Sequence, residues 1–336
     1  MPSDRVSLIA EVAQAHEGSL GIAHSYIDAL AGTGVDAIKF QVHIAEAESS
    51  PFEQFRIKFS REDASRFDYW KRMQFTADQW AEVKNHCEER GVEFMASPFS
   101  VAALELLEAI GVKQYKVGSG EISNFLLIDR IAATGKAVIL SSGLSSYEEL
   151  DAATSMFGKS SSTYSILQCT TAYPTRPEEW GLNVLQVLRE RFDCKVGFSD
   201  HSGNMYACLA AAALGAEILE FHAVFDQRMF GPDATSSLPI DEITRLTAGV
   251  RMIERALANP VDKNRTGMYS DLKIMFGKSL AVNKDLKKGH KIQLHDLESK
   301  KPAEKGIAAS DYRSVINRVI KRDLGRYTFL QSSDLQ

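Results

Sequence analysis

Two histidines with polar neighbours indicate metal chemistry between residues 195 and 233. The segment KVGFSDHSG places Ser199, Asp200 and His201 at the end of one apolar run, and the next run, ILEFHAV, contains His222. A single histidine in an apolar strand is more often a hydrogen-bonded core residue than a ligand. If the two runs are neighbouring parallel strands of a barrel, however, their C-terminal ends bring both imidazoles to one mouth. The pair therefore predicts a metal site there.

Ammonium and hydroxyl groups at other predicted strand ends indicate anion binding. Each such residue alone has a structural explanation, because a lysine can form a salt bridge and a serine can cap a helix. Two lysines and several hydroxyls at one mouth instead predict a phosphate site. A phosphate beside two histidines predicts a phosphorylated substrate next to Mn²⁺ or Mg²⁺, which accept oxygen ligands. The lysines and hydroxyls are Lys39, Ser97, Lys116, Ser119 and Ser142, and the other polar groups are Glu11, Gln41, Glu121, Thr171, Tyr173 and Glu220.

The order of apolar runs predicts the scaffold that holds these residues. Helical stretches, most of them closed by glycine, separate the runs. Alternation of this kind over about 255 residues predicts an α/β fold, a (β/α)8 TIM barrel covering residues 1–258. No GxGxxG follows the first run, which disfavours a doubly wound open sheet. The eight runs are residues 6–12, 37–42, 94–98, 114–119, 137–142, 164–170, 195–200 and 218–224.

Two segments fall outside this alternation. Residues 43–75 are too long for a plain connection and are predicted to form either a loop or lid over the mouth or a solvated excursion. Residues 259–276, with Pro260 and a polar stretch, predict a linker. Residues 277–336 then show short strands, with turn signals at Lys288-Gly289 and Lys305-Gly306, which predict a separate small domain.

Composition excludes several classes of partner. The chain has 336 residues, a net charge of −5 and 44% hydrophobic residues, so there is no basic excess to attract nucleic acid. The N-terminal sequence has no signal-peptide pattern, and no apolar stretch approaches the length of a membrane span. We therefore expect a cytoplasmic protein that binds neither nucleic acid nor membrane. The four cysteines form no CxxC pair and predict reduced thiols.

A series of motifs resembles the sialic acid synthase family. That family includes N-acetylneuraminate synthases, synthases of legionaminic and pseudaminic acids, and spore-coat polysaccharide synthase E-like proteins. The resemblance covers nearly the whole chain in order, including a C-terminal antifreeze-like (SAF) domain. The motifs are EVAQAHEG, DAIKFQ, MASPF, YKVGSGEI, SSGLSS, CTTAYPT, VGFSDHSG, EFH followed by GPD, and a tail running from SLAVNKDLKKG to KGIAAS.

The resemblance implies a transferase that condenses phosphoenolpyruvate with a sugar aldehyde of the N-acyl hexosamine type. The products would be a sialic-acid-like 2-keto-3-deoxy acid, for a surface polysaccharide, and phosphate. His201 and His222 would hold Mn²⁺ or Mg²⁺, and Lys39 would contact the carboxylate of phosphoenolpyruvate. The phosphate would lie against Ser97, Lys116, Ser119, Ser142 and Ser199. The implied catalytic residues are Glu11, Lys116, Glu121 and Asp233, and the sugar-side residues are Gln41, Thr171, Tyr173 and Lys301.

Five positions depart from the family pattern: Ala15, Thr171, Phe221, Ala234 and Lys301 stand where the family has Asn, Asn, Lys, His and Arg. The arginine, contributed by the SAF domain of a partner subunit, contacts the N-acyl group in relatives, and lysine cannot form the same planar fork. The acceptor is therefore predicted to differ from N-acetylmannosamine.

The resemblance also implies a domain-swapped homodimer in which each SAF domain covers the partner's mouth. Two other functions stay open. One is a metal-dependent aldolase acting on a different phosphorylated substrate, and the other is a carbohydrate-binding relative that has lost catalysis. Retention of Glu121, His201, His222 and Lys116 argues against the second.

Overall fold

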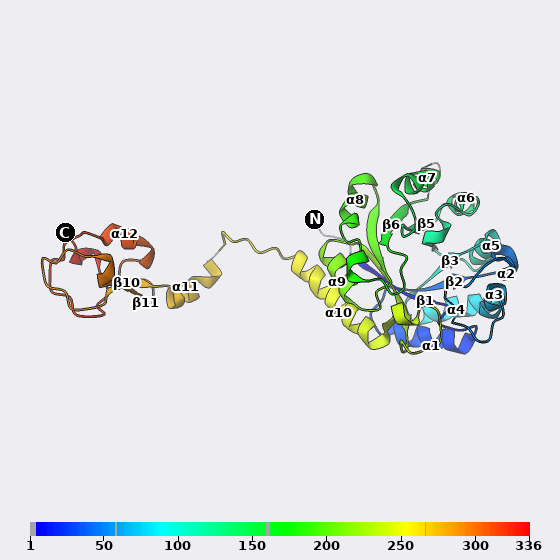
Figure 1. Cartoon of the computed structure of the whole chain (residues 1–336), viewed down its shortest axis with the longest axis horizontal. Coiled ribbons are helices and arrows are strands. Elements are labelled where there is room, and N and C mark those ends of the chain that lie inside the picture. Colours follow the sequence, from blue (N-terminus) through cyan, green and yellow to red (C-terminus); the bar gives the residue numbers. More distant parts are fainter. Residues whose placement is uncertain (1–4, 58, 159–161, 266) are drawn as a thin grey trace. The chain divides into compact units, whose positions relative to one another are not determined.

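The structure, a computed structural model, describes residues 5–57, 59–158, 162–265 and 267–336. It divides into two compact units, Met1–Pro260 and Val261–Gln336 (Figure 1). The division lies two residues after the predicted end of the barrel at residue 258. Part of the predicted linker, residues 270–276, is helical and belongs to the second unit.

The first unit is a closed parallel barrel, as the alternating pattern predicts. Consecutive strands pair along the sheet, and β1 also pairs with β8, which closes the ring among the described residues. A two-residue strand, β9 (Leu238–Pro239), extends beside β8. The barrel strands are β1 Ser7–Ala13, β2 Ala37–Val42, β3 Glu93–Pro98, β4 Gln114–Val117, β5 Ala137–Ser141, β6 Tyr164–Cys169, β7 Lys195–Asp200 and β8 Ile218–Val224.

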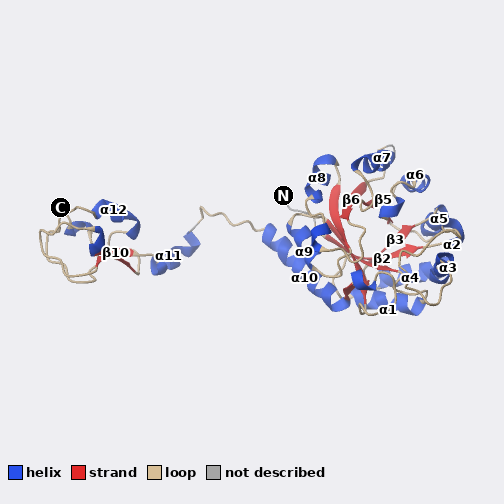
Figure 2. Ribbon diagram, viewed as in Figure 1, coloured by secondary structure: helices blue, strands red, loops and turns tan. Residues whose placement is uncertain are grey.

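Helices cover the outside of the barrel (Figure 2). Several begin at residues that satisfy the first free N–H groups, and Thr76 and Ser146 each form a reciprocal capping box. Apolar side chains of strands and helices pack in one large core. The covering helices are α1 Leu20–Ala31, α4 Ala77–Glu89, α5 Val101–Ala109, α6 Phe125–Ala133, α7 Tyr147–Phe157, α8 Val184–Arg191, α9 Tyr206–Ala213 and α10 Ile240–Leu257, with the 3-10 helices η1 Ser119–Glu121, η2 Pro177–Glu179 and η3 Ala234–Ser236.

Inside the ring, an apolar layer closes the barrel below its mouth. Ile9, Met95, Ile139, Leu167 and Ile218 form a buried cluster together with Ala37. Strand side chains alternate between the interior and the wall, so residues two positions further along these strands enter the next interior layer, nearer the C-terminal ends. This second layer carries the charged side chains described below.

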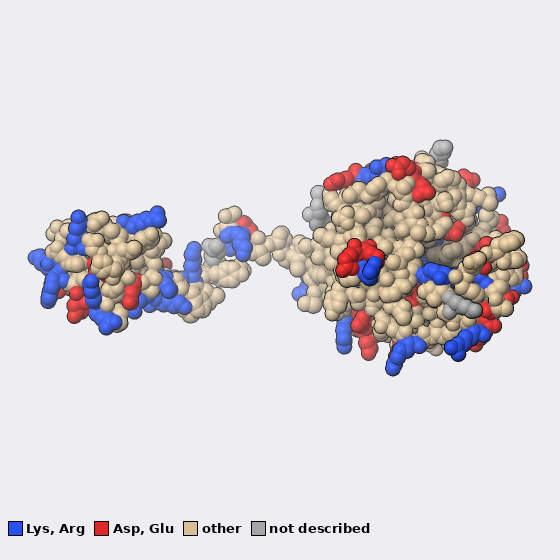
Figure 3. All heavy atoms as spheres, in the orientation of Figure 1, with Lys and Arg blue, Asp and Glu red and all other residues tan. Residues whose placement is uncertain are grey.

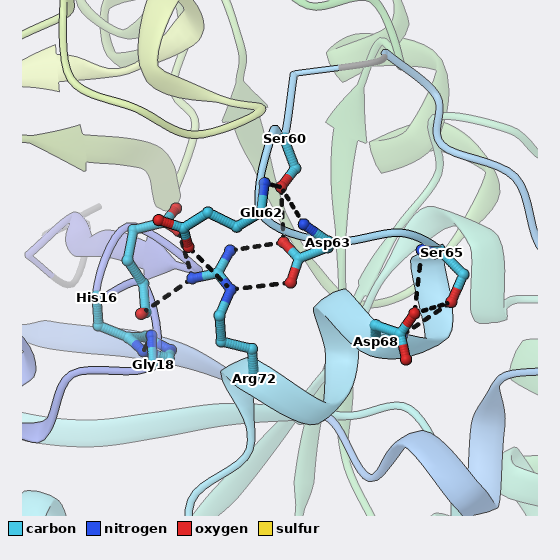
Figure 4. Close-up of polar contacts among 9 residues, drawn as sticks. His16, Gly18, Ser60, Glu62, Asp63, Ser65, Asp68 and Arg72 are labelled. Atoms are coloured by element: carbon cyan, nitrogen blue, oxygen red, sulfur yellow. Dashed lines mark hydrogen bonds and ion pairs between the residues drawn. The ribbon is translucent and has the colours of Figure 1, made fainter.

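The segment after β2 folds against the barrel instead of forming an open loop. It contains α2 (Ala45–Glu48) and α3 (Arg66–Met73), whose buried residues include Tyr69 and Trp70. Arg72 fixes α3: it donates to Asp63 at 2.8 and 3.0 Å and to the Glu17 carboxylate at 3.0 Å (Figure 4). The segment therefore has its own apolar core, which argues against a solvated excursion.

The second unit has a separate small core, as expected for residues 277–336. β10 (Ser279–Val282) and β11 (Leu297–Lys300) pair antiparallel, and α11 (Ser270–Phe276) and α12 (Tyr312–Val315) are short. Leu280, Val282, Ile292 and Leu330 lie in its buried cluster. Its 3-10 helices are η4 Gly267–Tyr269, η5 Leu294–Asp296, η6 Ala309–Asp311 and η7 Ser332–Asp334.

The visible face of the barrel unit carries charged side chains of both signs, and they are interspersed (Figure 3). Within the described part of the chain, no helix has the length and apolar character needed to cross a membrane.

Candidate active site

A cavity of about 260 Å³ lies among the C-terminal ends of the barrel strands. Strand register brings its polar groups together, since Glu11 of β1 lies beside both Lys39 of β2 and His222 of β8. The cavity contains most of the residues predicted from the sequence. They are Glu11, Lys39, Gln41, Ser97, Lys116, Ser119, Thr171, Tyr173, Ser199, His201, His222 and Asp233.

Three predicted site residues lie elsewhere. Ser142 points away from this cavity and donates its hydroxyl to the carbonyl oxygen of Leu167 at 3.0 Å. Its neighbour Ser141 lines the cavity instead, and its buried Oγ has no hydrogen-bond partner. Glu121 lines an adjoining cavity, and Lys301 belongs to the second unit.

Four buried charged side chains form the floor of the cavity, and we call them the charged quartet: Glu11, Lys39, Lys116 and Glu220. Lys39 pairs with the Glu11 carboxylate, and its Nζ lies 3.8 Å from Oε1 of Glu220. Lys116 Nζ donates to the same oxygen at 2.8 Å. The quartet therefore contains two ammonium groups and two carboxyl groups that share one desolvated volume.

Hydroxyl groups surround this charged layer. Ser97 Oγ accepts a hydrogen bond from Lys39 Nζ at 3.3 Å, and Ser199 Oγ donates to Glu220 Oε1 at 3.2 Å. Oε1 of Glu11 and Oε2 of Glu220 are buried without a hydrogen-bond partner. Buried unpaired polar atoms are costly unless a ligand or water satisfies them. The floor thus has the composition of a binding site.

The two carboxyl groups of the quartet differ in their proton affinity. Burial opposes ionisation of Glu220, but Lys116 and Lys39 outweigh it and lower the pKa to about 2. At Glu11 burial dominates and raises the pKa despite Lys39. Glu220 is therefore the permanent counter-charge of the lysines, whereas Glu11 can accept a proton and leave a net positive charge for an incoming anion.

The histidine pair lies beside the quartet. His201 Nδ1 is 2.9 Å from the carbonyl oxygen of Thr170, so that nitrogen donates, and Nε2 lies 3.2 Å from the Tyr173 hydroxyl. The ring of His222 lies 5.2 Å from that of His201 between centroids. Burial, followed by the charge of His201, holds the pKa of His222 well below its usual value, so its imidazole is neutral.

These features fit a metal site with open positions. A carbonyl that fixes the tautomer of one imidazole is the usual support of a metal ligand. The third candidate ligand, Asp233, lies 4.0 Å from His222 Nδ1 but pairs with Arg56. Among the described residues no group of three His, Cys, Asp or Glu side chains is arranged to hold a metal. Two imidazoles completed by water or substrate oxygen are therefore the arrangement that these residues fit.

Arg56 is a cavity residue that the sequence did not single out. It comes from the segment after β2, donates to Asp233 Oδ1 at 2.6 Å, and places its guanidinium 3.8 Å from the ring centre of Tyr173. Arg66 of α3 lines the same cavity. The only signal in the sequence was the length of the segment, which predicted a lid without identifying any of its residues. Glu220 and Ser141 stood at predicted strand ends but received no role.

A second cavity of about 660 Å³ adjoins the first and shares Gln41, Arg66, Trp70 and Phe99 with it. Glu121 lies in this second cavity, where Asn124 Nδ2 donates to its Oε2 at 2.7 Å. Burial raises the pKa of Glu121. The carboxyl group of Glu121, predicted to be catalytic, therefore lies in this second cavity and not on the charged floor.

The five departures from the family pattern have different locations. Thr171 lines the first cavity. Phe221 does not: it is 1% exposed and packs in the core, because the side chain between Glu220 and His222 points to the opposite face of β8. Ala15 packs against the same core, and Ala234 lines neither of the two cavities. Phe221 and Ala234 therefore have no place in the lining of either cavity.

The quartet predicts a specific effect of losing one lysine. Lys116→Met leaves Glu220 buried with less compensation, and we expect a loss of about 3–5 kcal/mol in the free energy of unfolding. Lys116→Met combined with Glu220→Gln should recover part of that loss. Urea unfolding followed by tryptophan fluorescence reports the barrel, since Trp70, Trp80 and Trp180 all lie in the first unit.

The control is Lys136→Met, which removes the partner of Glu108 from an exposed pair and should cost less than about 1 kcal/mol. Equal effects of the two lysine variants would contradict the assignment of Lys116 to a buried, coupled group.

Comparisons with known proteins show the family of this chain. The NeuB family model matches residues 26–262 and the SAF domain model matches residues 277–336. N,N'-diacetyllegionaminic acid synthase of Campylobacter jejuni is 31% identical over 94% of this chain and 96% of its own. N-acetylneuraminate-9-phosphate synthase of Homo sapiens is 30% identical over 93% of this chain and 88% of its own. The crystal structure of N-acetylneuraminic acid synthetase from Leptospira borgpetersenii in complex with citrate is similar with a TM-score of 0.70 and 29% identity, covering 80% of this chain and 90% of that one. The chain therefore belongs to the NeuB family, the sialic acid synthase family that its motifs predict, as an enzyme with a C-terminal SAF domain.

Proposed function

We propose that this enzyme condenses phosphoenolpyruvate with a sugar aldehyde to give a 2-keto-3-deoxy sugar acid and phosphate. The observation that carries the proposal is the buried charged quartet beside the histidine pair, His201 and His222, in one cavity. The named relatives at about 30% identity are synthases of legionaminic acid and N-acetylneuraminate 9-phosphate.

Phosphoenolpyruvate carries a phosphate and a carboxylate, and the cavity offers donors for both. We assign the phosphate to Lys116 with Ser119 and Ser199, and the carboxylate to Lys39 with Ser97. Binding of the anion would favour protonation of Glu11, whose raised pKa already makes this transition accessible. That proton would offset the extra negative charge on the floor.

The reaction forms one carbon–carbon bond and breaks one carbon–oxygen bond. C3 of phosphoenolpyruvate attacks the aldehyde carbon, the aldehyde oxygen takes up a proton, and positive charge develops at C2. Water adds at C2 and releases one proton, after which the C2–O bond to phosphate breaks, the phosphate leaves with the bridging oxygen and the proton of the C2 hydroxyl, and a ketone remains. Lys116 would stabilise the departing phosphate, and Glu11 is the quartet's candidate for moving a proton.

His201 and His222 would hold a divalent cation, Mn²⁺ or Mg²⁺. When bound, such an ion supplies Lewis-acid polarisation of the aldehyde oxygen. The protein's own contribution is to orient His201 through the Thr170 carbonyl and to keep His222 neutral through burial. We place Glu121, Asp233, Gln41, Thr171 and Tyr173 on the acceptor side.

We further propose that two copies of the chain form a dimer in which each second unit covers the partner's cavity. Residues 261–336 contain 16 Lys and Arg but only 9 Asp and Glu, whereas the whole chain contains 39 and 44. The small unit is therefore basic and the barrel acidic, which favours association between them. α11 and the residues before it also expose Met268, Leu272, Met275 and Phe276. Lys301 would then reach the acceptor of the other subunit.

The four free cysteines fit a reducing compartment such as the cytoplasm.

Phosphate release tests the reaction. The full-length chain with Mn²⁺ and phosphoenolpyruvate should release phosphate only when a suitable acceptor is added. The panel should include aldoses and N-acyl hexosamines, each with and without a terminal phosphate, and mass spectrometry should detect the nine-carbon acid or its analogue. Pyruvate formation by cleavage of a keto acid, without phosphoenolpyruvate turnover, would favour the aldolase. Failure to bind phosphoenolpyruvate at all would refute the synthase.

Removal of one histidine tests the metal. His222→Ala should bind Mn²⁺ at least roughly tenfold more weakly, because half of the proposed protein ligands are lost. Electron paramagnetic resonance of free Mn²⁺ measures binding without any turnover, and circular dichroism checks the fold. His295→Ala, at an exposed histidine of the second unit, is the control. Unchanged Mn²⁺ binding in His222→Ala would place the metal elsewhere.

Truncation tests the second unit. A chain ending at Phe276 should fold as a barrel, since that unit has its own core. We expect it to be monomeric in sedimentation velocity, with kcat/KM lowered roughly tenfold or more because water enters the uncovered cavity. The full-length dimer should weaken as salt is raised, because its units carry opposite charge. A fully active truncated chain would contradict the covering role.

A further inference from the structure

A chain of three polar side chains runs along the wall between the two cavities. Gln41 of β2 lines both cavities, and His43 and Glu48 line the second. Glu48 Oε1 lies 2.6 Å from His43 Nδ1, and His43 Nε2 lies 3.3 Å from Gln41 Oε1. Neither His43 nor Glu48 has a role in the reaction proposed above, so their arrangement needs its own explanation.

Two aromatic rings hold His43 rigidly in this series of hydrogen-bonded side chains. Its ring is 4% exposed and stacks between Trp70 and Phe99, with centroid distances of 3.7 and 4.3 Å and interplanar angles of 18° and 21°. A ring clamped on both faces cannot turn to exchange its partners. Both ring nitrogens therefore stay directed at Glu48 and Gln41.

The partners determine which atom carries each proton. The Gln41 oxygen can only accept, so His43 Nε2 must carry a hydrogen. Burial, followed by the charge of Arg66, holds the pKa of His43 well below its usual value, so the ring is neutral and Nδ1 is bare. Glu48 must then be the donor, as a protonated carboxylic acid.

Two further observations agree with a protonated Glu48. Burial, followed by the charge of Glu53, raises the pKa of Glu48 to about 8. Its second oxygen, Oε2, is buried without a hydrogen-bond partner. An unpaired carbonyl oxygen costs little in such a position, whereas an unpaired carboxylate oxygen costs much more. In the alternative arrangement the Gln41 amide is flipped, its NH₂ group donates to His43 Nε2, and His43 Nδ1 donates to an ionised Glu48. That arrangement would bury the negative charge of Glu48.

We propose that Glu48 and His43 are positioning residues that fix the Gln41 amide with its NH₂ group directed into the reaction cavity. The Gln41 Nε2 donates to no other side chain or backbone group of the described residues, so it is available to a ligand. It therefore selects acceptors that present a hydroxyl or carbonyl oxygen at this point and rejects those that present an ammonium group. This inference rests on the proposed function for its substrate and extends it to the specificity of the acceptor side.

The pH dependence of acceptor binding tests which group donates each hydrogen bond in the series Glu48, His43 and Gln41. As pH rises through about 8, Glu48 loses the proton that it donates and the order of hydrogen bonds is lost. The KM of the wild-type enzyme for its acceptor should then rise roughly tenfold, with kcat changed much less. Glu48→Gln cannot ionise and should lose this alkaline rise. The other charged groups facing Glu48 and His43 are Glu53, Arg66 and Glu121, which stay unchanged in the variant.

Two more variants complete the kinetic test. His43→Phe keeps a ring between Trp70 and Phe99 but removes both nitrogens, so KM for the acceptor should be raised at every pH. Glu46→Gln, at an exposed position of the same short helix, is the control and should match the wild type. An alkaline rise that persists in Glu48→Gln, or a wild-type KM in folded His43→Phe, would overturn the proposal.

The tautomer of His43 gives a readout that needs no turnover. Long-range ¹H–¹⁵N spectra at neutral pH should show a bare Nδ1 and a protonated Nε2, assigned by their absence in His43→Phe or by their shift in Glu48→Gln. A protonated Nδ1 would overturn the proposal even in an active enzyme. The predicted tautomer in a protein that turns over no acceptor supports this arrangement and counts against the proposed function alone.

Discussion

The active site depends on the mutual compensation of four charges in a volume closed to water. The two buried lysines are compensated by Glu11 and Glu220, and Glu220 in turn is kept ionised by both lysines. The four side chains come from strands β1, β2, β4 and β8, so the quartet forms only when β8 pairs with β1. The binding site therefore forms only when the barrel closes, and a chain in which one of these strands is misplaced would have neither a closed barrel nor a complete quartet.

Much of this scaffold could be predicted from the sequence, because its signals are local. Apolar runs between helix caps predict the strands closely, and β2 and β7 have the predicted bounds, 37–42 and 195–200. Parallel strands in a barrel bring their C-terminal ends to one mouth, which is why the order of strands alone is enough to expect Lys39, Lys116, His201 and His222 in one cavity.

The remainder depends on facts that no local pattern contains. Side-chain direction reverses at each strand residue, so a shift of one position decides that Ser141 and not Ser142 lines the cavity, and that Phe221 belongs to the core. Arg56 reaches Asp233 across 177 positions of sequence, through a segment whose path is set by its own apolar core. Proton positions, as on Glu48, depend on burial by several elements together.

The site residues that the sequence predicts and those that it does not single out come largely from different parts of the fold. The groups assigned to phosphoenolpyruvate lie on barrel strands or in the turns directly after them, where backbone pairing fixes their positions. Arg56, Arg66 and Trp70, which line the same cavity, instead come from the segment after β2, and in our proposal the same segment orients the acceptor-side Gln41 through His43 and Glu48. Because this segment has its own apolar core, its cavity-facing residues can change without disturbing the charged quartet. A shared condensation step with different acceptors is what such an arrangement permits, and the acceptor of this chain should be sought in the contacts of that segment.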